Sequence, residues 1–214
     1  RLRDPDSGAI FSPALFMPSV ERFDLGTRID RHVIELVFDW MESHPDEAQT
    51  ISSCSINLTA ATMQDHGFTD YLRGRFTRSS FPASKIIFEI TETSAVTNLG
   101  HAQTMIAELR LLGCRFSLDD FGSGFCSFQY LQNLDVDVFK IDGSFVRDLQ
   151  TSVLSKSVIR AITDIAGVLN KVTVAEQCES DYQLAILEEL GVDKAQGFII
   201  HEPEAISDFF RNYR

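Results

Sequence analysis

Short apolar runs with the character of strands alternate along this chain with segments in which apolar residues recur at helical spacing. The runs are rich in β-branched residues and phenylalanine, a composition typical of buried strands. They predict strands over residues 53–58, 85–91, 115–119, 136–141, 172–176 and 195–200.

The segments between these strands predict amphipathic helices, because their apolar residues fall on one face at a period of 3.6 residues. The predicted buried faces comprise Val33, Leu36, Val37, Trp40 and Met41; Ala102, Met105, Ile106, Leu109 and Leu112; Val158, Ala161, Ile162, Ile165, Ala166 and Leu169; and Leu184, Leu187 and Leu190. Strand–helix alternation without a linker or repeat predicts an α/β fold with a mostly parallel sheet, in one domain over residues 1–214.

Polar residues stand at or near the carboxyl ends of most predicted strands. They are Asn57, Glu89, Asp119, Lys140 and Glu176, with Gln196 near the start of the last strand. An open doubly wound sheet and a closed barrel both fit the alternation. Because strand ends converge on one mouth only in a barrel, we favour a TIM-like (β/α)8 barrel.

Composition and charge narrow the class of protein. The chain has 214 residues, 44% of them hydrophobic, and a net charge of −12. Its apolar runs are all shorter than the ~18 residues of a membrane span. An acidic surface repels nucleic-acid backbones and anionic membranes, so we expect neither DNA nor RNA as a partner. The four cysteines form no CxxC pair, which favours reduced thiols and a cytoplasmic location.

The polar strand ends predict a metal centre. Asn57, Glu89, Asp119, Asp120 and Glu176 offer oxygen ligands only, a set that suits Mg²⁺, Mn²⁺ or Ca²⁺. Four carboxylates at one mouth repel one another unless protons or cations neutralise them. We therefore expect two divalent ions.

The adjacent pair Asp119 and Asp120 needs a local change of backbone direction, because neighbouring strand residues point to opposite faces. We expect the turn at Phe121-Gly122-Ser123-Gly124 to bring both carboxylates to one site. Lys140 is expected to hold a phosphate oxygen or to orient an attacking water. Glu92, beyond its strand, is expected to brace a loop.

Six ordered blocks of the sequence resemble the signature of the EAL domain family. They are Asn57-Leu58-Thr59, Phe88-Glu89-Ile90-Thr91-Glu92-Thr93, Asp119-Asp120-Phe121-Gly122-Ser123-Gly124, Lys140-Ile141-Asp142, Ala175-Glu176-Gln177-Cys178-Glu179 and Gln196-Gly197-Phe198. The resemblance implies a TIM-like barrel that hydrolyses cyclic di-GMP to linear pGpG with Mg²⁺ or Mn²⁺. It also implies a homodimer and upstream sensory or GGDEF domains, so that the chain is the C-terminal part of a longer signalling protein.

The resemblance also implies roles for single residues. Asn57, Glu89 and Asp119 would hold one metal, and Asp119, Asp120 and Glu176 the second. Glu176, Lys140 and Asp120 would be catalytic, with Lys140 positioning the water. Arg1, Lys140, Gln177, Glu179 and Gln196 would contact the substrate. Glu92 would anchor the loop that begins at Phe121, Gly122, Ser123 and Gly124 and couples dimerisation to activity.

Departures from the family pattern leave alternatives open. Arg1 aligns with the last residue of the name-giving Glu-x-Leu-x-Arg block, so we expect a truncated first strand. Gln177 and Cys178 replace the Gly-Val pair that is usual after Glu176. The alternative to an active phosphodiesterase is a non-catalytic cyclic di-GMP receptor that signals through a partner. A barrel enzyme acting on another phosphoester is a third.

Overall fold

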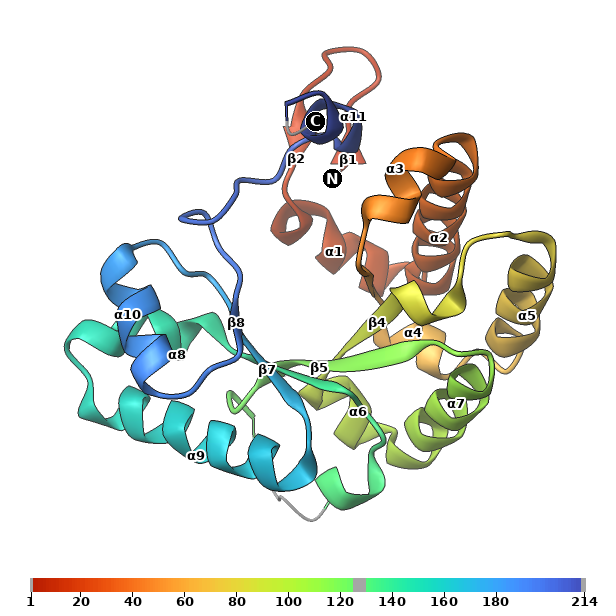
Figure 1. Ribbon diagram of the computed structural model, residues 1–214. Coiled ribbons are helices and arrows are strands. Elements are labelled where there is room, and N and C mark those ends of the chain that lie inside the picture. Colours follow the sequence, from red (N-terminus) through yellow and green to blue (C-terminus); the bar gives the residue numbers. More distant parts are fainter. Residues whose placement is uncertain (1, 125–129, 213–214) are drawn as a thin grey trace.

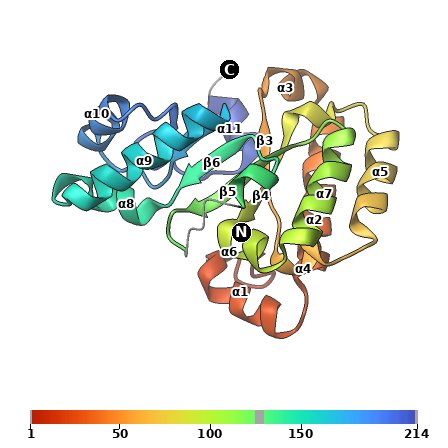
Figure 2. The same cartoon turned by 90° about the horizontal axis from the view of Figure 1, so that it is seen from below.

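A computed structural model describes residues 2–124 and 130–212. Its centre is a parallel sheet of six strands in the described residues, in the order β3-β4-β5-β6-β7-β8. The strands are β3 (Cys54–Asn57), β4 (Ile86–Thr91), β5 (Arg115–Phe121), β6 (Val138–Ile141), β7 (Val172–Ala175) and β8 (Lys194–Ala195). The sheet curls into a half-barrel, with helices around its convex side (Figures 1 and 2).

Helices separate most successive strands of the sheet, as the sequence predicts; between β5 and β6 the described residues contain only a short 3₁₀ helix. The α-helices are α1 (Pro13–Arg22), α2 (Gly26–Ser43), α3 (Pro45–Thr50), α4 (Ala60–Met63), α5 (Phe68–Arg78), α6 (Glu92–Thr97), α7 (Leu99–Leu111), α8 (Gly143–Arg147), α9 (Val153–Leu169), α10 (Asp181–Glu189) and α11 (Ile206–Asn212). Short 3₁₀ helices cover Ala83–Lys85, Leu131–Asn133 and Asp148–Gln150. In the described part of the chain, no helix is both long enough and apolar enough to cross a membrane.

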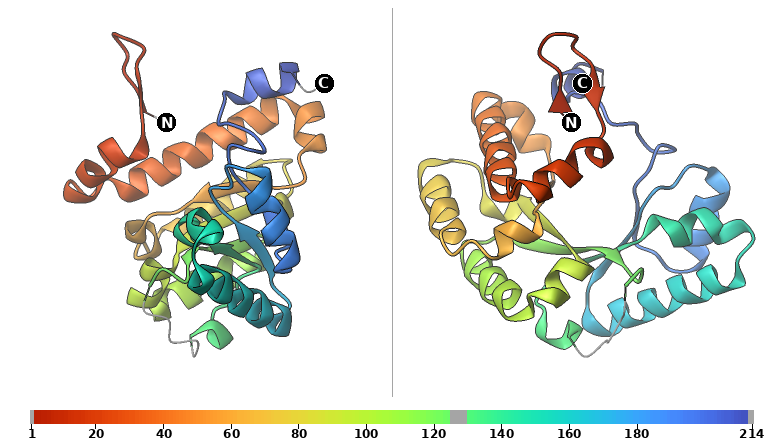
Figure 3. Two further views of the ribbon diagram at one scale, coloured as in Figure 1. Left: turned by 90° about the vertical axis from the view of Figure 1, so that its left-hand side faces the viewer. Right: turned by 180° about the vertical axis from the view of Figure 1, so that it is seen from behind.

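The predicted TIM-like alternation is confirmed, but the predicted closure into eight strands is not seen in the described residues. Strands β1 (Leu2–Arg3) and β2 (Ile10–Phe11) pair antiparallel with each other, apart from the six-stranded sheet. This hairpin projects away from the sheet in Figure 3. Because its strands join neither β3 nor β8, the curled sheet keeps two open edges.

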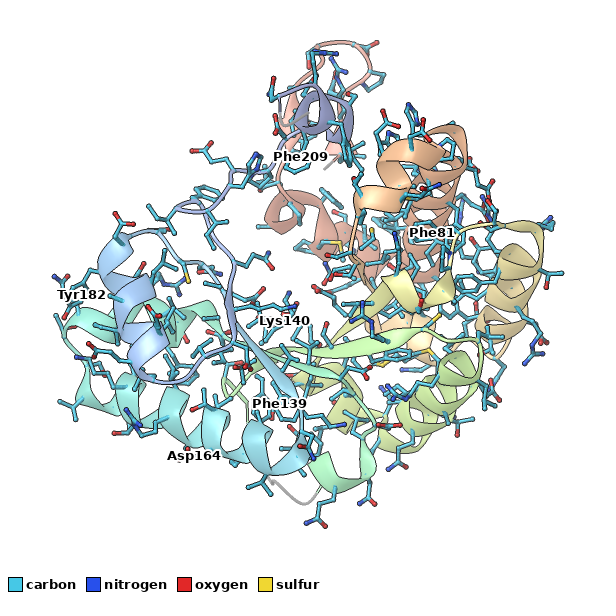
Figure 4. All side chains as sticks on the ribbon, viewed as in Figure 1. Phe81, Phe139, Lys140, Asp164, Tyr182 and Phe209 are labelled. Atoms are coloured by element: carbon cyan, nitrogen blue, oxygen red, sulfur yellow. The ribbon has the colours of Figure 1, made fainter. Side chains whose placement is uncertain are left out.

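Along each strand, side chains alternate between the core under the helices and the concave side of the sheet. Phe88, Phe116 and Phe139 are almost completely buried between the sheet and its helices. Their neighbours along the strands include Glu89 and Lys140, which point the opposite way because strand side chains alternate. Figure 4 shows this for β6, where Lys140 lies on the concave side and Phe139 faces α9.

The predicted buried face of α2 is wrong at two positions. Val33 is 38% exposed and Leu36 is 56% exposed, whereas Ile34 and Phe38 are fully buried. A neighbouring polar cluster accounts for this rotation. The guanidinium of Arg75 on α5 pairs with Glu35, Asp39 and Glu42, at distances of 2.8 to 3.0 Å. These ion pairs turn the acidic side of α2 towards α5 and leave Leu36 at the surface.

The last predicted strand is also corrected. The sequence predicts a strand over residues 195–200, but β8 ends at Ala195. At Gly197 the chain lies so close to Cys178 that a Cβ would overlap the Cys178 backbone. The Ile199 amide then donates to the Cys178 carbonyl at 3.2 Å, in place of a sheet hydrogen bond. The chain therefore turns out of the sheet directly after Gln196.

Buried Asp30 fixes the end of β3 to α2, and its loss should destabilise the fold. Its Oδ2 accepts hydrogen bonds from the Thr59 amide at 2.7 Å and from the hydroxyls of Thr59 and Thr62 at 2.8 and 2.5 Å.

Asp30→Ala leaves these donors unpaired, so urea denaturation should show that the free energy of unfolding falls by about 1–3 kcal/mol. Asp70→Ala, which removes an exposed partner of Arg73, should cost less than about 0.5 kcal/mol. Equal losses would contradict this role.

Candidate metal centre

Lys140 is the centre of a buried charge cluster on the concave side of the sheet. Its Nζ lies 2.6 Å from Glu89 Oε2, 2.7 Å from Glu176 Oε1 and 3.0 Å from Asp119 Oδ1. The four residues come from β4, β5, β6 and the end of β7, so the curl of the sheet brings them together. The side chains of Lys140 and Glu89 are 6% and 7% exposed, and this low accessibility strengthens the attraction between them.

The surroundings of these groups shift their pKa values in a consistent way. Burial alone lowers the pKa of Lys140, but the carboxylates of Glu89, Asp119 and Glu176 outweigh it and raise that pKa. Burial raises the pKa of Glu176 to about 7, against the opposing effect of Lys140. Burial and the neighbouring carboxylate of Asp119 also raise the pKa of Asp120. The cluster therefore holds more negative charge than its one ammonium can neutralise.

The two adjacent aspartates reach the same site by a different route from the predicted one. The sequence predicts that the turn after Asp120 reorients the chain, but β5 continues through Phe121. Asp120 itself adopts a left-handed backbone, with φ of 53°. The pairing of β5 with β6 shifts register between Leu118 and Phe121. This irregularity in the strand cancels the usual alternation, so both carboxylates face the concave side.

Carboxylate oxygens of Asp119, Asp120 and Glu176 lie within 4.8 Å of one another. Asp119 Oδ1 is buried and, among the described residues, accepts no hydrogen bond, although it lies near Lys140 Nζ. Asn57 is exposed and is the register partner of Glu89, which places it at the same end of the sheet. An under-satisfied carboxylate in an all-oxygen cluster with excess negative charge fits one or more hard divalent cations.

The predicted substrate-contacting residues lie in different surroundings. Gln196 is exposed and follows Ala195, the register partner of Ala175, so it lies beside Glu176. Glu179 is exposed just before α10, and its amide donates to Gln183 Oε1 at 2.7 Å. The side chain of Gln177 bonds to Arg147 on α8. Arg1 lies outside the described residues.

Glu92 holds both sides of the segment over residues 125–129. Its Oε2 accepts a hydrogen bond from the Gly122 amide at 3.0 Å, and its Oε1 accepts one from the Tyr130 hydroxyl at 2.6 Å. Ser123 Oγ donates to the Asp120 carbonyl at 2.8 Å. Phe121 is fully buried, and Gly124 lies beside the Glu92 carboxylate. The remainder of the predicted coupling loop, residues 125–129, lies outside the described residues.

Two polar residues near the cluster were not predicted as site residues. After burial and the carboxylate of Asp119, the nearby carboxylate of Asp142 also raises the pKa of Asp120. Asp142 Oδ1 accepts a hydrogen bond from the Ser144 amide at 2.7 Å, which caps α8. Ser117 lies two residues before Asp119 on the same side of β5 and is buried, with no hydrogen-bond partner for its Oγ among the described residues. Asp142 is two residues from Lys140, and Ser117 is two residues from Asp119. Because strand residues two apart lie on the same face, this spacing could have identified both as neighbours of the site.

The raised pKa of Glu176 predicts a pH dependence of stability in the metal-free protein. A carboxyl whose pKa is higher in the folded than in the unfolded state stabilises the fold fully below the unfolded value, and this contribution is lost as the pH rises through the folded value. Between about pH 4.5 and 7, the free energy of unfolding should therefore fall by an amount on the order of 2 kcal/mol that is attributable to Glu176.

Urea denaturation in the presence of a chelator measures this effect. Glu176→Gln should flatten the pH profile in that window relative to the native protein. Glu189→Gln, which changes an exposed residue on α10, should leave the profile unaltered. A native profile that Glu176→Gln does not change would show that Glu176 titrates normally.

Comparison with known proteins places this chain in a family. A model of the EAL domain matches residues 1–203. The chain is 35% identical over 213 residues to "Cyclic di-GMP phosphodiesterase PdeB" of Shewanella oneidensis, covering 100% of this chain and 25% of that protein. It is 34% identical over 201 residues to "Probable cyclic di-GMP phosphodiesterase PdeA" of Escherichia coli, covering 94% and 27%. The chain thus spans about a quarter of the length of these curated relatives.

Solved structures show the same architecture. "PaMucR Phosphodiesterase, c-di-GMP complex" has a TM-score of 0.90 and 29% identity, over 98% of this chain and 84% of the other. The FimX EAL domain from Pseudomonas aeruginosa bound to c-di-GMP has a TM-score of 0.87 and 27% identity, over 95% and 81%. The match over residues 1–203 and these similarities agree that the chain belongs to the EAL domain family.

Proposed function

We propose that this chain hydrolyses cyclic di-GMP to linear pGpG in a metal-dependent phosphodiesterase reaction. The observation that carries the proposal is the convergence of Asp119, Asp120 and Glu176 around one point, next to the buried ammonium of Lys140. Relatives that match nearly the whole chain are named cyclic di-GMP phosphodiesterases.

The oxygen ligands divide into two overlapping sets. Asn57, Glu89 and Asp119 would hold one Mg²⁺ or Mn²⁺, and Asp119, Asp120 and Glu176 the other. Two such ions supply Lewis acidity for attack on a phosphodiester and offset charge in the transition state. Asp119 belongs to both sets, and its buried Oδ1 has accepting capacity left for a cation.

The side chains around the ions perform the remaining tasks. Lys140 holds Glu89, Asp119 and Glu176 in place, and its positive charge helps to position the attacking water and to neutralise phosphate charge. Glu176 is proposed to be catalytic because it would hold one of the ions next to that water. Asp120 completes the catalytic set on the exposed side of the cluster.

The substrate is expected to lie across the exposed side of this cluster. Arg1, Lys140, Glu179 and Gln196 are the proposed contacts, together with the region around Gln177. An anionic dinucleotide approaches a chain with a net charge of −12 only if cations lie between its phosphates and the carboxylates. Substrate and metal binding are therefore coupled.

The chain is also proposed to act as one cytoplasmic module of a longer, homodimeric signalling protein. It spans only about a quarter of its curated relatives, and a 30% identical relative is named "Bifunctional diguanylate cyclase/cyclic di-GMP phosphodiesterase MucR". That name supports a GGDEF-type or sensory partner domain upstream. Through Gly122 and Tyr130, Glu92 holds the two sides of the segment proposed to couple dimerisation to the metal centre.

A non-catalytic cyclic di-GMP receptor is the second candidate. The observation that favours it is Gln177, which stands directly after Glu176 in a left-handed backbone conformation, with φ of 55°. A non-glycine residue there alters the immediate surroundings of a proposed metal ligand. The receptor would bind cyclic di-GMP without releasing pGpG.

Substitution of Asp119 separates the two candidates. The full-length protein, incubated with cyclic di-GMP and Mg²⁺ or Mn²⁺, should release pGpG that chromatography detects. Asp119→Ala removes a ligand of both proposed ions and should lower the rate at least about a hundredfold. Asp70→Ala, on the exposed side of α5, should retain the native rate. Binding of cyclic di-GMP by the native protein without product would favour the receptor, and undiminished turnover by Asp119→Ala would refute the assigned site.

A further inference from the structure

Gln177 occupies a position that disfavours its residue type. Its φ of 55° lies in the left-handed region, where an L side chain crowds its own backbone. It directly follows Glu176, whose carboxylate lies 2.7 Å from Lys140 Nζ. The usual family residue at this position is glycine, which adopts the same conformation without strain. Another interaction must therefore favour glutamine in this chain.

The side chain of Gln177 supplies that interaction by reaching α8. Its Oε1 accepts a hydrogen bond from Nη1 of Arg147, in the last turn of α8. It also lies directly over Gly143, where a Cβ would be 2.7 Å from Gln177 Cγ. Any side chain at position 143 would displace Gln177. We call the set of Gln177, Arg147 and Gly143 the Gln177 bridge.

The bridge joins two of the chain segments that carry the charge cluster, the one after β6 and the one after β7. Helix α8 starts directly after Lys140, Ile141 and Asp142, so it continues the strand that carries the ammonium of the cluster. On the other side, the Glu176 amide donates to the Ile141 carbonyl at 3.3 Å, beyond the last residue of β7. The backbone at Cys178 is tied to the chain after β8 by hydrogen bonds with Gln196 and Ile199, whereas the Glu176 amide makes this long hydrogen bond to β6. The Gln177 bridge adds an attachment of the same segment to α8.

We propose that Gln177 is a positioning residue that acts through Arg147 to hold Glu176 at the distance from Asp119 and Asp120 that a divalent cation requires. This inference rests on the proposed metal site and gives Gln177 a role through α8 in addition to the substrate contact proposed for it. Residues that orient metal ligands without touching the metal typically change metal affinity tenfold or more when they are replaced.

Mn²⁺ titration of the full-length protein by calorimetry, without nucleotide, tests the proposal. Gln177→Met keeps the side-chain length and loses the acceptor, and Arg147→Met removes the donor. Each should weaken Mn²⁺ binding roughly tenfold. The double variant should be no weaker than either single variant, because both remove the same bond. Gln177→Glu keeps an acceptor for Arg147 and should bind Mn²⁺ at least as well as the native protein.

Matched measurements separate positioning from general stability. Arg160→Met replaces an exposed arginine on α9 and should leave the Mn²⁺ affinity unchanged. Native-like affinity in Gln177→Met and Arg147→Met would overturn the proposal, whether or not their melting temperatures fall. Additive losses in the double variant would also overturn it. A native protein that binds no Mn²⁺ would instead contradict the proposed metal site itself and, with it, any positioning role.

Discussion

One buried ammonium among too many carboxylates is the constraint on which this site depends. Lys140 contacts Glu89, Asp119 and Glu176, and Asp120 adds a further carboxylate nearby. Charges in an environment of low polarity interact strongly, so the ammonium fixes three carboxylates that would otherwise separate. Since a single positive charge cannot neutralise the cluster, the arrangement is prepared for divalent cations. Burial, with a further contribution from the carboxylate of Asp119, raises the pKa of both Glu176 and Asp120.

The fold serves this cluster through the curl of its sheet and two unusual backbone conformations. The curl brings four neighbouring segments of the sheet to one concave side (Figures 1 and 4). Left-handed residues then follow two of the acidic positions, Asp120 after Asp119 and Gln177 after Glu176. Each redirects the chain where regular alternation would turn a side chain away. Strain at these two points persists because the surrounding hydrogen bonds hold the backbone in place.

Most of the site could be predicted from sequence because its residues follow strand ends. The alternation of strands and helices, the positions of Glu89, Asp119, Lys140 and Glu176, and the bracing role expected of Glu92 all depend on local patterns. The predictions that failed depend on contacts between distant segments. Arg75 rotates α2 and exposes Leu36, Gly197 packs against Cys178 and ends β8, and β1 pairs with β2 outside the sheet. The reorientation of Asp120 required the pairing of β5 with β6, which a single strand does not reveal.

The most direct test of a Lys140-organised metal centre is a crystal structure of the full-length protein grown with Mn²⁺, in which anomalous scattering locates the ions. The account predicts two peaks, each within roughly 2.3 Å of carboxylate oxygens, with Asp119 contacting both and Asp120 and Glu176 contacting one of them. Lys140 Nζ should remain beside Glu89. Peaks elsewhere, or none at this cluster at saturating Mn²⁺, would contradict the account and leave the carboxylates with a purely structural role.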